Sequence, residues 1–375
     1  MKRALSCTVQ QAYAKRKLTD RAVLYVGFEC NAKCRFCYFA ELDKEQRKWK
    51  PLTKLKQEAS MFRNVYNNKS VDITGGEPTI YPEIVKLVEF CDSIGLKPTI
   101  ITNGIRTADK KFLGELKKAR LRDLLISVQG YKTKMTKITG VKGHYKKILE
   151  TFKNCNELGI PFRINCVIHK LNYQDLDKIA RLVCKHGAKV VNFIVFNPYY
   201  KWTEKNKIDF QAQHSEISPY LSKAINEVEK QGIECNVRYL PFCFLPKEQR
   251  HTIMNWMQLS YDKWEWDASS WHRWTNEMQL SLLLESGFRE VFSTNKYDAL
   301  YNTFALRIRR QLYVKPSTCA GCFAKNICDG LTKQYFARFG QYELEPIKDM
   351  FETKDPLYYK IEKIRGEKND RKGKR

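Results

Sequence analysis

The sequence predicts an α/β fold, a parallel sheet wound with helices, followed by a small α+β domain. From Arg21 onward, short runs rich in β-branched residues alternate with amphipathic runs of helical length. The strand-like runs are apolar throughout, as expected for a sheet that helices cover. This β-then-α unit occurs six times, and six such units most simply form a partial (β/α)6 barrel.

Each of the six expected strands precedes an expected helix. The strands are predicted at 22–28, 70–74, 97–102, 123–128, 162–168 and 190–196. The helices are predicted at about 51–67, 82–94, 108–119, 144–158, 174–186 and 215–231. Gly95, Gly159 and Gly187 fall where a helix should give way to a strand. In parallel sheets of this kind, ligands bind at the carboxyl ends of the strands.

The alternation stops after about residue 235. The run "CNVRYLPFCFLP" predicts a strand that enters a new unit, and a tract with five of the seven tryptophans follows, at 256, 264, 266, 271 and 274. This tract is expected to form either the core of a small domain or a platform for substrate rings. The predicted divisions are an N-terminal extension (1–20), the barrel (21–234), the second domain with its Trp-rich insertion (235–358) and a basic disordered tail (359–375).

The formal net charge of +26 predicts an acidic partner, either nucleic acid, an acidic peptide or an anionic surface. Lysine outnumbers arginine, the residue that reads phosphate in bidentate fashion, so the charge alone does not choose among these partners. No apolar run approaches the roughly 20 residues that span a bilayer, and the first residues lack the pattern of a signal peptide. We therefore expect no membrane partner and a cytoplasmic location.

Three cysteines follow the first strand closely, Cys30, Cys34 and Cys37 in "FECNAKCRFCY". In a reducing compartment, clustered cysteines indicate metal ligands rather than disulfides. Three thiolates can hold three irons of a [4Fe–4S] cluster and leave the fourth iron open to a non-protein ligand. The alternatives are a buried stripe on a helix and part of a zinc site. The scattered cysteines are expected to be small buried residues: Cys91, Cys155, Cys166 and Cys184.

A second motif, Gly75-Gly76-Glu77-Pro78, follows the next strand. The glycines lack side chains where a backbone is expected to approach a ligand closely. Glu77 offers an acceptor for an ammonium group, and Pro78 holds it in an extended conformation. Alone this tetrapeptide predicts only a turn, but its place after the cysteine triad indicates a ligand site.

These motifs resemble those of the radical S-adenosylmethionine (radical SAM) enzymes, whose signature Cys-x3-Cys-x-aromatic-Cys is matched by Cys30, Cys34, Phe36 and Cys37. The resemblance covers about residues 21–200 and implies a TIM-like partial barrel. It also implies a [4Fe–4S] cluster whose open iron S-adenosylmethionine chelates, and a reductant such as flavodoxin or ferredoxin.

The resemblance further implies residues that contact S-adenosylmethionine. Gly75, Gly76 and Glu77 would hold its amino group, and Phe36 would pack near its adenine. The ribose and methionyl contacts would come from later strand ends: Asn103, Ser127 and Asn165. The implied chemistry is reductive cleavage to a 5′-deoxyadenosyl radical, which takes a hydrogen from the substrate. No substrate-specific catalytic residue is assigned.

A second cysteine cluster, Cys319, Cys322 and Cys328, lies near the C-terminus, and Cys243 is the natural fourth ligand with Cys235 as the alternative. The spacing fits a four-cysteine zinc site. It also resembles the SPASM and twitch auxiliary domains that follow many radical SAM barrels. Because no cysteine follows Cys328, a shortened twitch-like domain is the better match. That resemblance implies a second [4Fe–4S] cluster, closed by four thiolates and suited to electron transfer.

The leading hypothesis is therefore a radical SAM enzyme that oxidises, or forms a bond in, a peptide or protein. The first alternative is the same chemistry on a nucleotide or nucleic acid, in keeping with the positive charge. The alternative from another class is a basic zinc protein that binds nucleic acid without catalysis.

Overall fold

The computed structural model describes residues 19–64, 68–198, 208–255, 257–258, 262–264 and 312–363. The expected N-terminal extension and most of the expected C-terminal tail lie outside these ranges. So does most of the Trp-rich tract, of which only 257–258 and the backbone of 262–264 are described.

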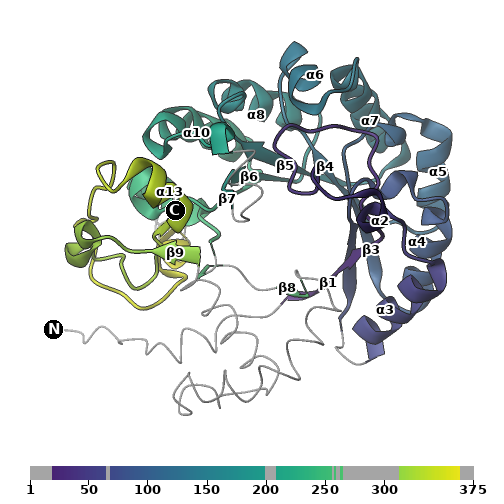
Figure 1. The fold of residues 1–375 in the computed structure, drawn as a ribbon, viewed down its shortest axis with the longest axis horizontal. Helices are drawn as coiled ribbons and strands as arrows, with labels where there is room; N and C mark the ends of the chain where they lie inside the picture. The colour runs from purple at the N-terminus through teal and green to yellow at the C-terminus, as the bar shows by residue number, and fades with distance from the viewer. Residues whose placement is uncertain are drawn as a thin grey trace, which may run out of the picture.

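The core of the fold is one curved sheet in which every neighbouring pair of strands is parallel, in the order β7-β6-β5-β4-β3-β2-β1-β8 (Figure 1). From β1 to β7, each strand lies beside the one before it in sequence. This order and the curvature confirm the expected partial barrel. The strands are β1 Thr19–Tyr25, β2 Ser70–Thr74, β3 Lys97–Thr102, β4 Asp123–Ser127, β5 Phe162–Ile168, β6 Val190–Val195, β7 Glu234–Arg238 and β8 Asp262–Trp264.

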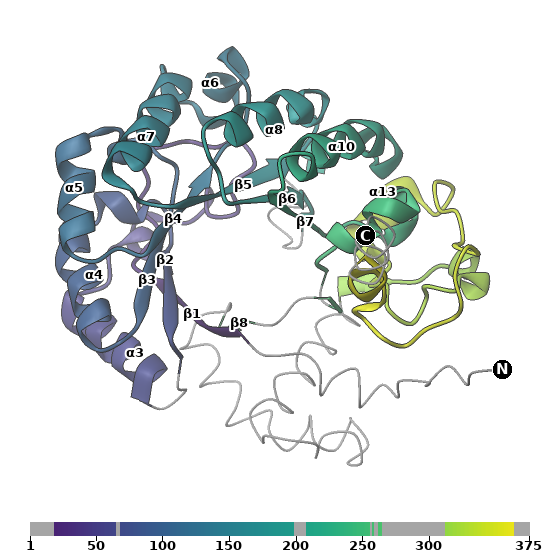
Figure 2. The same ribbon diagram turned by 180° about the vertical axis from the view of Figure 1, so that it is seen from behind.

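The helices cover the convex face of the sheet, as both views show (Figures 1 and 2). Their apolar sides pack on the strands; for example, Phe152 stacks on Phe162 of β5 with ring centroids 4.9 Å apart. The six expected helices are α3 Leu52–Asn64, α4 Ile84–Ser93, α5 Lys110–Lys118, α7 His144–Leu158, α8 Leu176–Lys185 and α10 His214–Glu229. Between the expected elements of the barrel, the described residues also form the short helices α2 Lys44–Arg47 and α6 Thr133–Thr139, which were not expected. None of the helices in the described ranges has the length and apolar character needed to cross a bilayer.

The structure differs from the sequence prediction in two strands of the sheet, β7 and β8, the second of which pairs with β1. The segment after Gly232 was expected to enter a new unit, but β7 continues the barrel sheet, with Glu234 opposite Val190 and Arg238 opposite Ile194 of β6. The sheet therefore runs past the boundary expected after residue 234. The physical reason is burial, since Cys235 and Val237 alternate with more exposed residues and give β7 a buried side.

Charged side chains near the amino ends of the strands form ion pairs with one another. Arg163 of β5 donates to the carboxylate of Asp123 at 3.1 Å, and Arg21 pairs with Asp72 at 3.2 Å. These groups are mostly buried and neutralise one another inside the barrel. At the carboxyl ends, β1 leads into the loop with Cys30, Cys34 and Cys37, and β7 leads into the turn with Cys243.

A small C-terminal unit lies beyond β7 (Figure 1). It contains a two-stranded antiparallel sheet of β9 Tyr313–Val314 and β10 Leu331–Thr332, and then α13 Lys333–Phe339. Tyr335 of α13 stacks on His214 of α10, with ring centroids 3.8 Å apart. This composition agrees with the expected small α+β unit, while the exact domain limits stay a prediction.

Candidate functional site: two clusters of cysteines

The first cluster lies on the loop that leaves the carboxyl end of β1. No helix spans Cys30, Cys34 and Cys37, so the alternative of a helical stripe is wrong. The loop is fixed against α6 by backbone hydrogen bonds, in which Lys33 donates to Thr139 at 2.8 Å and Arg35 to Ile138 at 3.0 Å. Cys30 is exposed, and Cys34 and Cys37 are half-buried.

The three thiols lie within electrostatic reach of one another. Loss of hydration is the main cause that raises the pKa of Cys30 to about 11, and the charges of Glu77 and Cys37 raise it further. The same causes raise the pKa of Cys34. Backbone N–H groups point at the sulfurs, since Ala32 donates to Cys30 Sγ and Phe39 to Cys37 Sγ, each at 3.4 Å. Three soft sulfur donors on one loop fit an iron–sulfur cluster with one open iron.

In the part of the chain that the structure describes, no group of three or more His, Cys, Asp and Glu side chains is arranged to bind one single metal ion.

The Gly75-Gly76 segment packs directly on the backbone of the cysteine loop. Gly76 donates to the carbonyl of Gly27 at 2.9 Å, and Glu77 donates to the carbonyl of Glu29 at 2.8 Å. A Cβ atom would lie 2.0 Å from the Gly27 oxygen at position 75 and 2.1 Å from the Glu29 oxygen at position 76. The two glycines were expected to lie close to a ligand. In the structure they lie against the backbone of the triad loop, and this contact holds the loop at the end of β2.

The Glu77 carboxylate joins the ends of β2 and β3. Its Oε1 accepts from Thr79 and from the Thr102 hydroxyl at 2.7 Å, and its Oε2 accepts from the backbone N–H of Asn103 at 2.6 Å. The side chain is 1% exposed, and burial raises its pKa while these hydrogen bonds lower it. The expected role as an acceptor for an ammonium group stays a prediction, and Oε2 is the oxygen with the fewer protein donors.

Asn103 also supports the cysteine loop. Its Nδ2 donates to Asn31 Oδ1 at 2.7 Å, and its Oδ1 accepts from the N–H of Ile105 at 3.0 Å. Its side chain therefore contacts protein on both polar atoms. The expected ribose contact would have to compete with these bonds.

Ser127 and Asn165 lie opposite each other on β4 and β5, and both are half-buried. The polar row continues in register to Asn192 of β6 and Asn236 of β7. Asn192 donates to Asn165 Oδ1 at 3.0 Å, and Asn236 donates to Asn192 Oδ1 at 3.2 Å. Sequence analysis missed Asn192 and Asn236, although a polar residue within an apolar strand was the available signal.

His169, at the carboxyl end of β5, was also missed. Its ring lies 5.0 Å from the ring of Phe36, the aromatic residue of the triad motif. Burial and the nearby Arg35 lower the pKa of His169 to about 3, so the ring is neutral. Its Nδ1 accepts from the N–H of Leu171 at 3.2 Å, which leaves the hydrogen on Nε2. This buried Nε2 has no hydrogen-bond partner among the described residues, and a ligand beside Phe36 would supply one.

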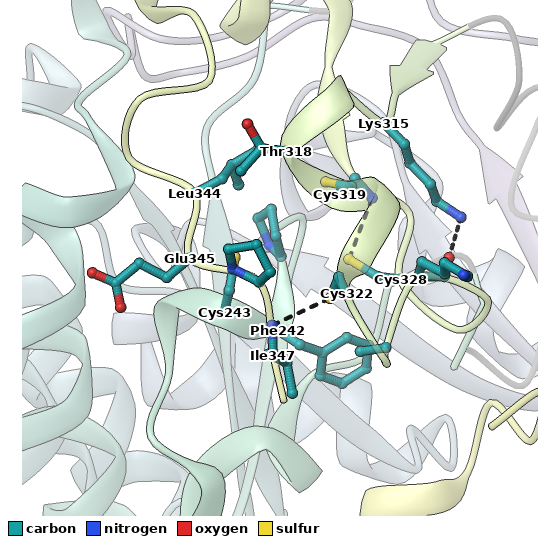
Figure 3. A pocket seen from close by; sticks show the side chains of 15 residues that line it. Phe242, Cys243, Lys315, Thr318, Cys319, Cys322, Cys328, Leu344, Glu345 and Ile347 are labelled. Carbon is teal, nitrogen blue, oxygen red and sulfur yellow. Dashed lines mark hydrogen bonds between the residues drawn. The ribbon is translucent and has the colours of Figure 1, made fainter. Parts of the chain in front are cut away.

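The second cluster is a single pocket lined by Cys243, Cys319, Cys322 and Cys328 (Figure 3). Cys243 lies in the turn after β7, and the other three lie between β9 and β10. Cys235 is buried in β7 and is not among the lining residues.

Backbone N–H groups surround these sulfurs. Ile347 donates to Cys322 Sγ and Gly330 to Cys328 Sγ, each at 3.4 Å. Burial raises the pKa of Cys243, and a backbone hydrogen bond from Glu345 opposes that rise. Hydrogen bonds of this kind stabilise thiolate ligands of a metal cluster and tune its potential.

The family model described as the Radical SAM superfamily matches residues 24–183, from β1 to α8. Over these residues the chain is similar to the radical SAM family. The family implies a [4Fe–4S] cluster and S-adenosylmethionine, and the triad loop offers the three thiols that such a cluster needs. The match ends before Cys243, so it does not cover the second cluster.

Two curated relatives are similar to part of this chain. The PqqA peptide cyclase of Methylorubrum populi is 32% identical over 148 residues, which are 39% of this chain and 38% of the relative. The probable GTP 3',8-cyclase of Sulfurisphaera tokodaii is 26% identical over 216 residues, 56% of this chain and 66% of the relative. The chain thus matches well under half the length of the peptide cyclase.

Among solved structures, SuiB of Streptococcus suis bound to the precursor peptide SuiA is similar at a TM-score of 0.49 and 23% identity. The superposition covers 59% of this chain and 48% of SuiB. The similarity to the radical SAM family rests on the match over residues 24–183.

Gly76→Ala should separate the triad loop from β2, because the added Cβ meets the Glu29 carbonyl. We expect the free energy of unfolding to fall by about 1–3 kcal/mol, measured with urea, and the triad to retain less iron after anaerobic reconstitution. Gly114→Ala is the matched control, since nothing lies within 4 Å of its added Cβ in helix α5. Equal iron content and stability in Gly76→Ala and Gly114→Ala would contradict the role of the contact.

Proposed function

We propose that this chain is a radical SAM enzyme with two [4Fe–4S] clusters that modifies a peptide or protein in the cytoplasm. The observation that carries the proposal is the triad loop, with Cys30, Cys34 and Cys37 at the carboxyl edge of a radical SAM barrel. When bound, the reduced cluster and S-adenosylmethionine supply a 5′-deoxyadenosyl radical that takes a hydrogen from the substrate.

The residues of the chain bind, orient and shield in this proposal. The three triad thiolates hold three irons and leave the fourth to S-adenosylmethionine. Phe36 and the Nε2–H of His169 are the groups available to an adenine ring, one by packing and one as a hydrogen-bond donor. The half-buried Ser127 and Asn165 offer polar atoms deeper in the barrel. Enclosure by the strands and loops keeps water and side reactions from a radical.

In the second pocket, Cys243, Cys319, Cys322 and Cys328 would hold an auxiliary cluster. Four protein thiolates close all coordination positions, so this group would exchange electrons rather than bind substrate. The support is that all four sulfurs line one pocket with N–H donors around them. A flavodoxin or ferredoxin would supply the electrons.

A peptide substrate is the first choice, because relatives of this chain are named for a peptide that they cyclise. A nucleotide or nucleic acid is the second candidate, supported by the GTP cyclase relative and by the net charge of +26. The two candidates differ in what the positive charge does.

Cys34→Ala should abolish formation of 5′-deoxyadenosine under a strong reductant, because it removes one of three iron ligands. Anaerobic reconstitution should give about eight irons per chain, and about four in the variant. Liquid chromatography of the nucleoside and iron analysis measure both. Cys184→Ala in α8 is the matched control and should keep both values. Zinc in place of iron, with no cleavage of S-adenosylmethionine by the unmodified chain, would favour the non-catalytic zinc protein.

Cys322→Ala should act differently, since it removes a ligand of the second pocket only. We expect continued but uncoupled cleavage of S-adenosylmethionine, loss of modified substrate, and about four irons per chain. Mass spectrometry of a candidate substrate gives the product yield. An unchanged yield in this variant would refute an essential auxiliary cluster.

A salt series separates the two substrate classes. For a peptide-modifying enzyme, we expect weak retardation of RNA or DNA in a gel that disappears between roughly 50 and 200 mM salt. Retention of one sequence at the upper end of this range, against a scrambled control, would favour the nucleic-acid candidate instead.

A further inference from the structure

Asn197 lies just beyond the carboxyl end of β6 and is 1% exposed. Its backbone carbonyl accepts a hydrogen bond of 2.6 Å from the hydroxyl of Tyr38. Tyr38 directly follows Cys37 of the triad, and its ring stacks on Phe196 with centroids 5.8 Å apart. The backbone of Asn197 is thereby joined to the end of the triad loop.

The side chain of Asn197 bonds to the strand that follows the second cysteine cluster. Its Oδ1 accepts from the Thr332 hydroxyl at 3.1 Å, and Thr332 is 2% exposed. Thr332 lies in β10, two residues after Gly330, whose N–H donates to Cys328 Sγ at 3.4 Å. Residues that follow Cys37 and Cys328 therefore both bond to Asn197.

The amide of Asn197 has one defined orientation. Its Oδ1 also accepts from Gln211 Nε2 at 3.1 Å, and its Nδ2 donates to the carbonyl of Val195 at 3.2 Å. Both lone pairs of Oδ1 are used, so a rotation of the amide would break three side-chain bonds and leave buried polar groups unpaired. These bonds restrict independent movement of Asn197, Thr332 and Gln211.

We propose that Asn197 is a positioning residue that couples the two cysteine sites. A change in the segment after Cys37 passes through Tyr38 and Asn197 to Thr332, and a change at Cys328 passes back by the same bonds. The proposal rests on the proposed function only for the groups that the cysteines hold; the coupling belongs to the folded chain itself. It fixes the geometry between the site of radical formation and the electron-transfer site.

The test removes the Tyr38 hydroxyl and measures amide hydrogen exchange at the second cysteine site. In the reconstituted full-length protein, Tyr38→Phe should raise amide hydrogen exchange in residues 319–332 by at least about fivefold, the lower end of typical coupling between sites. Exchange is normalised to helix α8, so that a general loss of stability is subtracted. Tyr131→Phe is the matched control, because Tyr131 packs on Tyr145 away from Asn197. An effect of Tyr38→Phe confined to residues 33–42 overturns the proposal.

A second experiment changes Thr332 and observes the triad cluster by spectroscopy. Thr332→Val should alter the electron paramagnetic resonance signal of the triad cluster in the presence of S-adenosylmethionine, while Thr332→Ser, which keeps the hydroxyl, restores it. A triad signal in Thr332→Val identical to that of the parent overturns the proposal. If Tyr38→Phe raises exchange in residues 319–332 but the unmodified protein does not cleave S-adenosylmethionine, the coupling holds and the proposed function is wrong. If S-adenosylmethionine is cleaved but exchange in residues 319–332 does not change, the proposed function holds and the coupling is wrong.

Discussion

The backbone pairing between the Gly27–Glu29 segment and the Gly76–Glu77 segment is the contact on which the first site depends. Two N–H···O bonds and two glycines without Cβ atoms let the triad loop lie flat on the end of β2. Glu77 then connects the same point to β3 through Thr102 and Asn103. Protein hydrogen bonds thus fix the ends of three adjacent strands without a ligand. The positions of the three thiols depend on these strand ends.

Most of the barrel was predictable because its signals are local. Apolar strand runs, amphipathic helices and the glycines between them predicted strands β2 to β6 and the six longer helices within a few residues. The place of β7 was not predictable in this way, since a strand of the barrel and a strand of a new unit have the same local pattern and only pairing with β6 distinguishes them. Likewise, the sequence contains the pair Gly75-Gly76 but does not reveal whether a ligand or Glu29 lies against it.

The two cysteine clusters share one scaffold, although they lie far apart in sequence. The radical SAM domain supplies the triad, the turn after β7 supplies Cys243, and the small C-terminal sheet supplies the remaining thiols. The polar row from Ser127 to Asn236 runs across strands β4 to β7 of the same sheet. The motifs were visible in the sequence, whereas the contacts of His169 and Asn197 depend on neighbours brought in by folding.

The position of Cys243 has a consequence for how the protein matures. A chain emerging from the ribosome completes the triad loop and its β2 support within the first quarter of its length, and N-terminal parts fold first. Cys243 follows at the end of the barrel, but its partners emerge only after the Trp-rich tract has been synthesised. If the proposed clusters are bound, the thiols of the second pocket come together only after residues 319–328 have been synthesised, later than the triad and the α6 residues that support it.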